Sequence, residues 1–441
     1  MKFNKLCWVL AAALAVASSQ ADAQSDWDSF QNQGTLQNGS WKLATQWSPD
    51  SGIQWETALK GYGQSTPVIH KDRIYLTTVL GDNKEEVSVQ AISLNDGKPV
   101  WDFKRANSSP EKNTPMVARA ASSPVVDENG VIAFFEGGNL LALDHEGKLK
   151  WERDLNKEKG GLKARHGIAA SLAQNDEVVF VWCERMENPF VLAISKADGK
   201  TIWEQAGLGG TSWSSPRLLK VGQENHLVLS GIGIVAGLDP STGKRLWEFR
   251  EVSGNSSATP VSVGDGKFLI GASGGRNPNQ NSTPSCGVIE VKKSEEGYAV
   301  GWDWVADEAS CSFGSPIACA GRAYFVNRVG VVHCHDLATG DSVFTSRIPC
   351  GQIWATPLAS QEHIYFFGKD GKTAVLKVGE KLDVVSENVL WNEENKAPAA
   401  GASPENRFSG PVLYAAAVAD GRLLLRRGDR LYCLNSAQKG E

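Results

Sequence analysis

The sequence predicts an all-β protein that folds as an eight-bladed β-propeller of four-stranded units, and three observations carry this prediction. The 441-residue chain has 45 glycines and 15 tryptophans against 3 methionines, a balance that favours many short strands over packed amphipathic helices. A small-x-Pro element and a Gly-Lys turn followed by Trp each recur along the chain. The last unit lacks its fourth strand, and a matching strand is present near the start.

The first repeated element is a small-x-Pro tripeptide followed by alternating apolar residues, a pattern that predicts the inner strand of each unit. The third residues of successive copies lie 41 to 60 positions apart. The copies end at Pro67, Pro124, Pro216, Pro260, Pro316 and Pro357, with weaker, proline-free copies ending at Ala170 and Ala417. The sequence therefore predicts eight units.

The second repeated element is an apolar alternation, a polar turn with glycine, and then Trp. It ends at Trp101, Trp151, Trp203 and Trp247, and Phe344 replaces the Trp in the sixth unit. Asp-Gly and Thr-Gly pairs in these turns indicate hairpins, because glycine accepts a positive φ without steric cost. Each unit therefore has four predicted strands, with the Trp on the outer one as an anchor between units. Such units cannot bury both faces alone, so we expect them to stack around an axis.

Ring closure is predicted from the two ends of the repeat region. The last unit stops after the strand at 430–434, before any Trp-bearing strand, and the segment 52–57 carries Trp55 ahead of the first inner strand. Pairing these two segments covers two open edges. We therefore expect one domain over 41–434, a tail at 435–441, and polar loops at 104–115, 274–286 and 396–409.

The N-terminal residues predict export. Residues 1–23 contain a basic start, an apolar run over 6–17 and a small-x-small site before Gln24, as in a secretory signal peptide. The apolar run is shorter than the roughly 20 residues that span a bilayer. We expect a monomer in the periplasm or secreted, cleaved near Ala23, without a transmembrane segment. Residues 24–40 then form an arm that binds either its own propeller or another protein.

Charge argues against one class of partner. The chain has 45 basic and 50 acidic residues, a formal net charge of −5, and no block of basic residues. Nucleic-acid binding requires a basic surface. We therefore expect a protein or a small molecule as the ligand of the propeller.

The segment 236–247 is similar to the unit of the PQQ-like (pyrroloquinoline quinone) repeat propellers, Ala-x-Asp-x-x-Thr-Gly-x-x-x-Trp. It runs from Ala236 through Asp239, Thr242 and Gly243 to Trp247. The resemblance covers about 390 residues and implies the fold. The family contains quinoprotein dehydrogenases, which hold the quinone and calcium at the propeller centre, and non-catalytic relatives such as the BamB subunit of the β-barrel assembly machinery. Exported PQQ-like repeat proteins without assigned activity resemble the chain in layout, including the arm with Trp27.

Two features depart from the catalytic branch. No two cysteines are adjacent, and Cys-x-x-Cys-His is absent. The resemblance therefore implies an exported binding scaffold without a cofactor, with envelope protein assembly as one role. The alternative is a PQQ- and calcium-dependent dehydrogenase of alcohols or sugars that acts over the channel at Arg119, His166 and Trp213. Against the BamB role stands the lack of a lipid-attachment cysteine near the start.

Candidate ligand-binding residues precede the inner strands, where we expect the mouth of the central channel. Arginines and aromatic side chains there can clamp an anionic planar ligand or an acidic, aromatic peptide; alternatively, they plug the channel and tie neighbouring blades together. The candidates are Tyr62, Gln64, Arg119, Arg165, His166, Trp213, Asn255, Phe313, Gln352, Trp354, Arg407 and Phe408.

The remaining cysteine and histidine residues predict no catalytic or metal site. Seven of the eight cysteines follow the cleavage site, an odd number, and Cys286 with Cys311 is the best candidate for a disulfide. His333 and His335 flank Cys334 in a predicted strand, where side chains alternate, so a packed strand is the favoured interpretation over a metal site.

Overall fold

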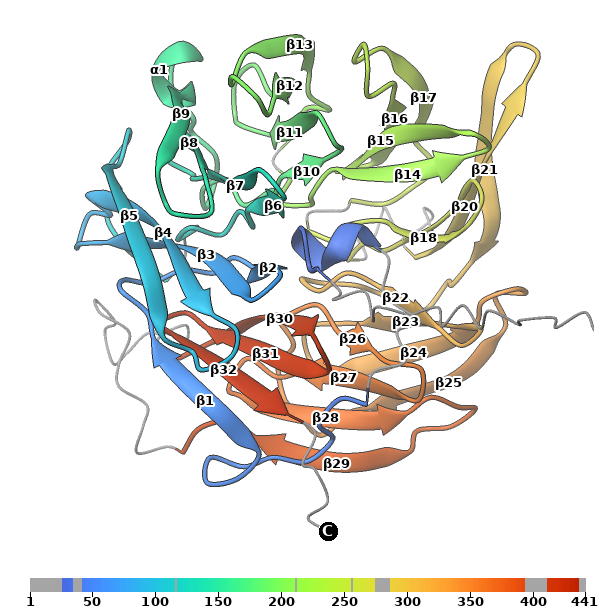
Figure 1. Cartoon of the computed structure of the whole chain (residues 1–441). Coiled ribbons are helices and arrows are strands. Elements are labelled where there is room, and N and C mark those ends of the chain that lie inside the picture. Colours follow the sequence, from blue (N-terminus) through green and yellow to red (C-terminus); the bar gives the residue numbers. More distant parts are fainter. Residues whose placement is uncertain are drawn as a thin grey trace, which may run out of the picture.

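The computed structural model describes residues 26–34, 42–115, 117–210, 212–254, 257–273, 286–392 and 411–435. Their strands form eight four-stranded antiparallel sheets, which surround a common axis as the blades of a propeller (Figure 1). The predicted fold is thus confirmed. The predicted signal peptide, the predicted loop at 396–409, the predicted tail except Asn435 and the predicted loop at 274–286 except Cys286 lie outside the described residues.

The first four blades follow one another in the sequence, each from its inner to its outer strand. Blade 1 has β2 (Val68–His70), β3 (Arg73–Leu80), β4 (Glu86–Ser93) and β5 (Pro99–Ala106). Blade 2 has β6 (Val125–Asp127), β7 (Gly130–Phe134), β8 (Asn139–Leu143) and β9 (Leu149–Asp154), followed by the short helix α1 (Leu155–Glu158). Blade 3 has β10 (Ala173–Gln174), β11 (Val178–Cys183), β12 (Phe190–Ser195) and β13 (Thr201–Ala206). Blade 4 has β14 (Arg217–Val221), β15 (Glu224–Gly231), β16 (Ile234–Leu238) and β17 (Arg245–Phe249).

The next three blades repeat this order, and the eighth takes its outer strand from the start of the chain. Blade 5 has β18 (Val261–Gly264), β19 (Lys267–Ile270), β20 (Gly287–Ser294) and β21 (Gly297–Val305). Blade 6 has β22 (Ile317–Cys319), β23 (Arg322–Val326), β24 (Val331–Asp336) and β25 (Ser342–Arg347). Blade 7 has β26 (Leu358–Ala359), β27 (His363–Phe367), β28 (Lys372–Lys377) and β29 (Val384–Val389). Blade 8 has β30 (Leu413–Ala419), β31 (Arg422–Arg427), β32 (Arg430–Asn435) and β1 (Ile53–Ala58).

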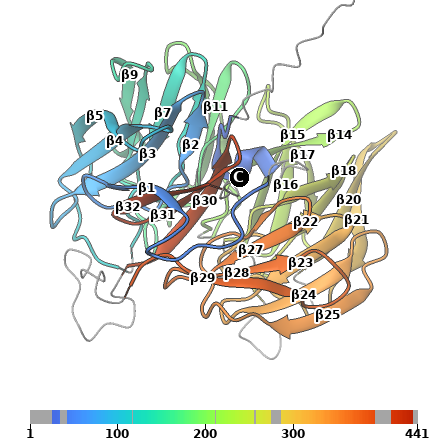
Figure 2. The same ribbon diagram turned by 60° about the horizontal axis from the view of Figure 1, so that its bottom comes forward.

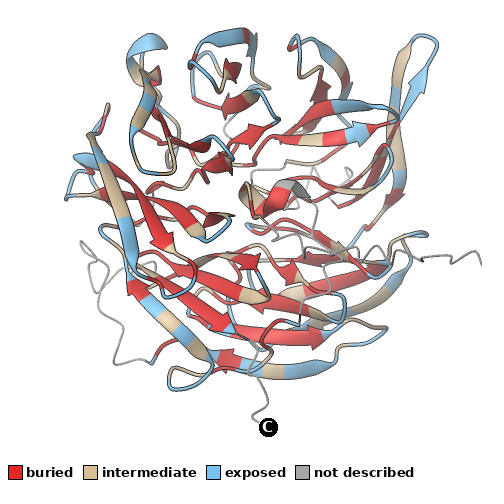
Figure 3. Cartoon of the chain, in the orientation of Figure 1, coloured by how far each residue is buried: buried red, intermediate tan, exposed pale blue. Residues whose placement is uncertain are grey.

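The ring closes as the sequence predicts. Strand β1 pairs antiparallel with β32 (Figure 2), and Trp55 lies opposite Cys433. The N-terminal strand thereby covers the edge that blade 8 would otherwise expose. The second and third strands of the blades are the most buried, and the outer strands alternate between exposed and partly buried residues (Figure 3).

Tryptophans on the outer strands of several blades anchor the blade to the next one. The Trp101 ring lies against the turn of blade 2, where its Nε1 donates a hydrogen bond to the His145 carbonyl at 2.8 Å. A Cβ at Gly147 would come within 2.7 Å of that ring, so this turn position requires glycine for space as well as for its φ of +81°. The same arrangement joins Trp151 to Gly199 and Trp203 to Gly243. The predicted anchor role is confirmed for these three tryptophans, whereas the Trp247 Nε1 donates to His226 of its own blade.

A belt of hydrogen bonds links the small-x-Pro elements around the axis. The Thr66 N–H donates to the Ser123 hydroxyl at 2.9 Å, and the Ser123 N–H donates to the Ser171 hydroxyl at 3.0 Å. The same hydrogen bond, from a backbone N–H to the hydroxyl of the next unit, continues through Ser215, Thr259, Ser315 and Thr356. The hydroxyl residue before the proline therefore satisfies a backbone donor of the preceding blade.

The belt and the strand pairing correct the register of the two proline-free copies. In the third unit the belt residue is Ser171, so the tripeptide ends at Leu172, not at Ala170. In blade 8 the strand pairing shows the register: Ala419 pairs with Arg422 as His70 pairs with Arg73 in blade 1, so the copy ends at Ala416, not at Ala417. Without the proline, alignment on the alanines alone misplaces both copies.

Two faces of the ring follow from the strand order. Because neighbouring strands are antiparallel, the turns after the first and third strands lie on one face, here called the turn face. The loops after the second strand and the connections between blades lie on the other, here called the loop face. Most candidate residues precede an inner strand and therefore belong to the loop face. Within the described residues, no helix is long and apolar enough to cross a membrane.

Candidate functional site

The described part of the N-terminal arm lies across the centre of the ring (Figure 1). Trp27 and Ile69 of β2 exchange backbone hydrogen bonds of 2.8 and 3.0 Å, and the Asp28 carbonyl accepts from Val126 of β6. The arm then forms the 3₁₀ turn η1 (Phe30–Gly34). Residues 26–34 of the arm thus contact their own propeller.

Arg217, the first residue of β14, holds the arm by hydrogen bonds. Its Nη2 donates to the Gln31 Oε1 at 2.7 Å and to the Phe30 carbonyl at 3.3 Å. The side chain is 2% exposed and has no acidic partner among the described residues, and burial lowers the pKa of Arg217 to about 9. Within the described part of the chain, a buried cation without a counter-ion therefore lies beside the arm.

Three of the predicted site residues meet at the junction of blades 1, 2 and 8. The Arg119 guanidinium lies 3.7 Å from the centre of the Tyr62 ring, and its Nη2 donates to the Tyr414 hydroxyl at 3.2 Å. The Gln64 side chain accepts from the Arg119 N–H at 2.9 Å. Burial raises the pKa of Tyr62 well above its usual value. This cluster ties blades together, as the plug interpretation expects, and Arg119 is 3% exposed.

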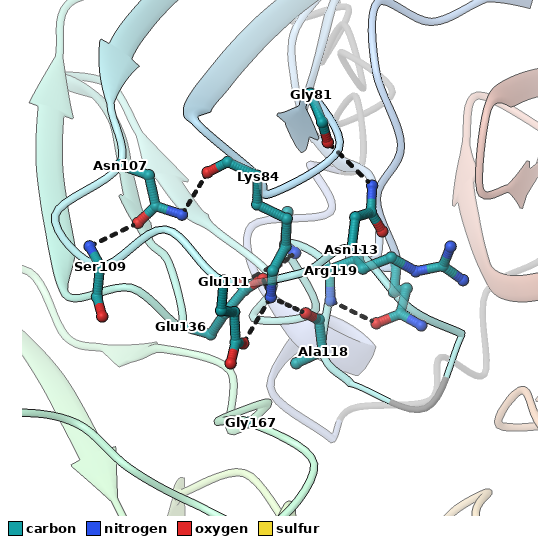
Figure 4. Close-up of polar contacts among 12 residues, drawn as sticks. Gly81, Lys84, Asn107, Ser109, Glu111, Asn113, Ala118, Arg119, Glu136 and Gly167 are labelled. Atoms are coloured by element: carbon teal, nitrogen blue, oxygen red, sulfur yellow. Dashed lines mark hydrogen bonds and ion pairs between the residues drawn. The ribbon is translucent and has the colours of Figure 1, made fainter. Parts of the chain in front are cut away.

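A buried ion cluster that the sequence did not reveal lies beside Arg119 (Figure 4). The Lys84 Nζ, which is fully buried, contacts Glu111 at 2.7 Å, Glu136 at 3.2 Å and the Ala118 carbonyl at 2.9 Å. Glu136 also accepts from the Ala120 N–H. Burial raises the pKa of the Glu136 carboxyl, and the Lys84 charge opposes that shift. The only sequence signal was the polar loop at 104–115, which carries Glu111.

Backbone strain gathers at the same place. Lys84, Ala120 and His166 have φ values of +53°, +47° and +68°, a conformation that residues other than glycine rarely adopt. They are connected through Ala118, whose carbonyl accepts from Lys84 and whose N–H donates to the His166 carbonyl. Strain of this kind persists where the surroundings over-determine the backbone, and it concentrates at functional sites.

Four of the other candidates form two aromatic pairs. His166 and Trp213 lie 5.9 Å apart, and the Trp213 Nε1 donates to the Gly167 carbonyl. Phe313 and Trp354 lie 5.5 Å apart, and Phe313 is 44% exposed. Arg165 and Gln352 are exposed. Asn255, Arg407 and Phe408 lie outside the described residues.

A cavity of about 110 Å³ lies between the arm and the second aromatic pair. Its lining has no acidic or basic side chain. The lining residues are Trp27, Phe30, Gln31, Thr66, Phe313, Trp354, Thr356, Pro357, Leu358, Tyr414, Ala415 and Ala416.

The described residues of this channel do not fit a pyrroloquinoline quinone with calcium. Calcium takes oxygen ligands, commonly carboxylates, and no carboxylate lines the cavity. Nowhere in the described residues do three His, Cys, Asp or Glu side chains gather as a potential metal site. The volume compares with the roughly 150 Å³ that holds a single benzene ring, whereas the quinone is a fused tricycle. We therefore derive no redox step.

The cysteines and paired histidines belong to the core. Cys286 and Cys311 are buried thiols, and burial and a hydrogen bond between the two raise the pKa of Cys311. Their disulfide stays a prediction, which mass spectrometry of the unreduced protein can test. His333 and His335 hydrogen-bond to Thr345 and to the Gly340 carbonyl, on a largely buried β24, so the packed-strand interpretation is confirmed.

Comparisons with known proteins agree with this architecture. The family profile described as "Outer membrane protein assembly factor BamB" matches residues 42–182 and 162–277. A curated relative, the outer membrane protein assembly factor BamB of Moranella endobia, is 26% identical over 232 residues, which cover 51% of this chain and 53% of that protein. The aligned part thus spans about half the length of this relative.

Solved structures of low identity share the fold. BamB from Moraxella catarrhalis has a TM-score of 0.58 at 14% identity, over 88% of this chain and 98% of its own. The quinohemoprotein alcohol dehydrogenase of Comamonas testosteroni also has a TM-score of 0.58, at 12% identity, over 94% of this chain and 82% of its own. Since the profile match covers more than half of the sequence and the repeat is present in eight blades, the chain belongs to the PQQ-like repeat propeller family represented by the outer membrane protein assembly factor BamB.

Proposed function

We propose that this protein is a binding scaffold of the bacterial envelope, exported to the periplasm, which docks a protein partner on its loop face and serves in envelope protein assembly. The curated BamB relative supports the assembly role. The observation that carries the docking surface is the distribution of exposed apolar side chains.

Nine large apolar side chains are exposed in the described residues, and five of them lie on outer strands. Of those in the described residues, the ones outside the outer strands all lie on the loop face. They are Met186 (71% exposed), Ile232 (49%), Phe313 (44%) and Val329 (44%). Exposed apolar groups gathered on one face mark an interaction site.

The loops that carry two of these side chains are held in place. The Met186 N–H donates to the Lys163 carbonyl at 2.9 Å, and Ile232 bridges Gly254. Met186 and Ile232 thus project from neighbouring blades 3 and 4, each tied to the connection that precedes or follows its blade. A preorganised apolar pair lowers the entropic cost of docking a partner.

Genetic complementation in the organism that carries this chain tests the proposal. Deletion should lower the amount of folded outer-membrane β-barrel protein, and the wild-type gene should restore it. A Met186→Asp/Ile232→Asp variant should fail to restore it, because it places charges on the docking surface. Ala197→Asp adds a charge at an exposed position of the turn face and should restore it. Full complementation by the double variant would contradict docking at this surface, and no effect of deletion would contradict the assembly role.

A further inference from the structure

Two exposed cations lie next to the apolar side chains of the loop face. Lys163 and Arg165 are exposed on the connection between blades 2 and 3, and the Lys163 carbonyl accepts the hydrogen bond that holds Met186. Neither cation has an ion-pair partner among the described residues, whereas Lys159 of the same connection pairs with Glu204 at 2.6 Å. Within the described part of the chain, two positive charges without counter-ions therefore lie near the 71%-exposed Met186.

A buried carboxylate holds the next part of this surface in place. Glu184 precedes Met186 by two residues, is 2% exposed and accepts hydrogen bonds from two backbone N–H groups of the loop 207–210. That loop lies against blade 4, because a Cβ on Gly210 would lie 3.8 Å from the Ile232 side chain. The loop 207–210 thus connects Met186 to Ile232 in one continuous surface, which is fixed before a partner binds.

The charge of this surface is opposite to that of the whole chain. The chain has a formal net charge of −5, whereas Lys163, Arg165, Met186 and Ile232, here called the docking patch, carry two positive charges and no negative one. Exposed charges beside an apolar contact attract a partner of opposite sign and raise its rate of association. The docking patch therefore fits a partner that presents an apolar side chain next to carboxylates.

Glu187 favours a polypeptide over an anionic membrane as this partner. Its carboxylate is exposed, directly follows Met186 and has no ion-pair partner among the described residues. A layer of anionic lipid headgroups would meet Glu187 together with the two cations, whereas a polypeptide can place its carboxylates beside the cations alone. Two exposed apolar side chains also offer little area for insertion into a bilayer, and the strength of such insertion scales with that area.

We propose that the docking patch binds an acidic polypeptide segment of the partner protein. The segment packs an apolar side chain against Met186 and Ile232, and its carboxylates lie against Lys163 and Arg165. This inference rests on the proposed docking of a protein on the loop face, and it names the chemistry of that partner.

Site-specific photo-crosslinking in the organism that carries this chain identifies the segment. The full chain with Met186→p-benzoylphenylalanine is irradiated in living cells, and mass spectrometry reads the crosslinked peptide. The same substitution at Ala197, exposed on the turn face, controls for chance contacts. A net negative charge on the residues that flank the crosslink supports the proposal. A neutral or basic segment would overturn it while leaving the docking role intact, whereas crosslinks to lipid alone, or none, would overturn both.

Charge reversal then tests the two cations, with the crosslinked segment as a synthetic peptide. Lys163→Glu/Arg165→Glu should weaken peptide binding about tenfold or more, and most strongly at low salt. Lys148→Glu/Lys244→Glu makes the same charge change at exposed positions of the turn face and should bind as the wild type does. Wild-type affinity of the Lys163→Glu/Arg165→Glu variant would overturn the proposal.

Two further variants keep this test decisive. Lys163→Gln/Arg165→Gln only neutralises the charges, should give a smaller loss of affinity, and takes the place of the reversed variant if that one does not fold. Met186→Asp/Ile232→Asp should abolish binding whatever the charge of the segment, because it disrupts the apolar contact. Loss of binding in this variant alone would therefore overturn the acidic segment and keep the docking role.

Discussion

The turn face and the loop face are made by the same repeat, yet they differ in how their backbones are held. On the turn face, aspartates accept nearby N–H groups, as Asp144 does from Lys148 at 2.8 Å and Asp336 from Ala338 at 3.0 Å. On the loop face, connections of unequal length are held by a buried lysine with two glutamates and by Arg119 stacked on Tyr62.

The difference shows which contacts specify the fold and which contacts are particular to this protein. The turn face is specified locally, because each Asp-x-x-Thr-Gly or Asp-Gly-Lys turn satisfies its own donors. The loop face is specified by contacts between segments far apart in the sequence, such as Arg119 with Tyr414. Changes to the loop face can therefore alter binding while the repeat maintains the ring.

The largest expected effect comes from breaking the ion cluster of the loop face. Lys84→Met should destabilise the protein by about 3–5 kcal/mol, because it leaves the 3%-exposed Glu136 carboxylate buried without its cation. Urea unfolding at neutral pH measures this loss. Lys84→Met with Glu136→Leu removes both charges and should recover most of the stability. A loss below about 1 kcal/mol for the single variant would show that the cluster does not hold the loop face.

On the turn face, the contact between Trp101 and Gly147 can be tested with a matched glycine. Gly147→Ala forces a Cβ to within 2.7 Å of the indole at a φ of +81°, whereas Gly160 has a φ of +71° and nothing within 4 Å. Both substitutions should cost about 1 kcal/mol for the backbone. Gly147→Ala should cost about 1–3 kcal/mol more through overpacking. Equal losses in thermal or urea unfolding would show that the tryptophan does not require the glycine.

The belt between the two faces is the third target. Ser123→Ala removes the hydroxyl that accepts from the Thr66 N–H at 2.9 Å and should cost about 1–3 kcal/mol by leaving a buried donor unpaired. Its neighbour Ser122 is equally buried, and its hydroxyl has no partner among the described residues. Ser122→Ala should therefore be nearly neutral. If the two variants unfold alike, the belt does not contribute to ring closure.

Sequence reasoning succeeded where a residue pattern acts locally or repeats. The Trp and Gly-Lys pattern predicted the blades, and the strand with Trp55 predicted the closure. Sequence reasoning placed Tyr62, Gln64 and Arg119 near one another. It could not show that Arg119 is buried or that its guanidinium contacts Tyr62 and Tyr414. Nothing in the sequence paired Lys84 with Glu136, 52 residues away, because that contact depends on how two loops of unequal length pack.

The smallest expected effect is a pH dependence of the stability, which arises in the core of blade 4 between the two faces. The Trp247 Nε1 donates to the His226 Nδ1 at 3.0 Å, so that nitrogen must be unprotonated. Burial lowers the pKa of His226 below its usual 6.5 in the folded state, although Glu224 opposes the shift. The unfolded state therefore binds more protons as the pH falls below about 6.5, and stability should decrease from pH 7 towards pH 5. Urea unfolding at these two values measures the decrease, and His226→Gln, which keeps a polar side chain but does not titrate, should reduce it. A His226→Gln variant with the full pH dependence of the wild type would assign the effect to other histidines, of which His145 and His333 also have lowered pKa values.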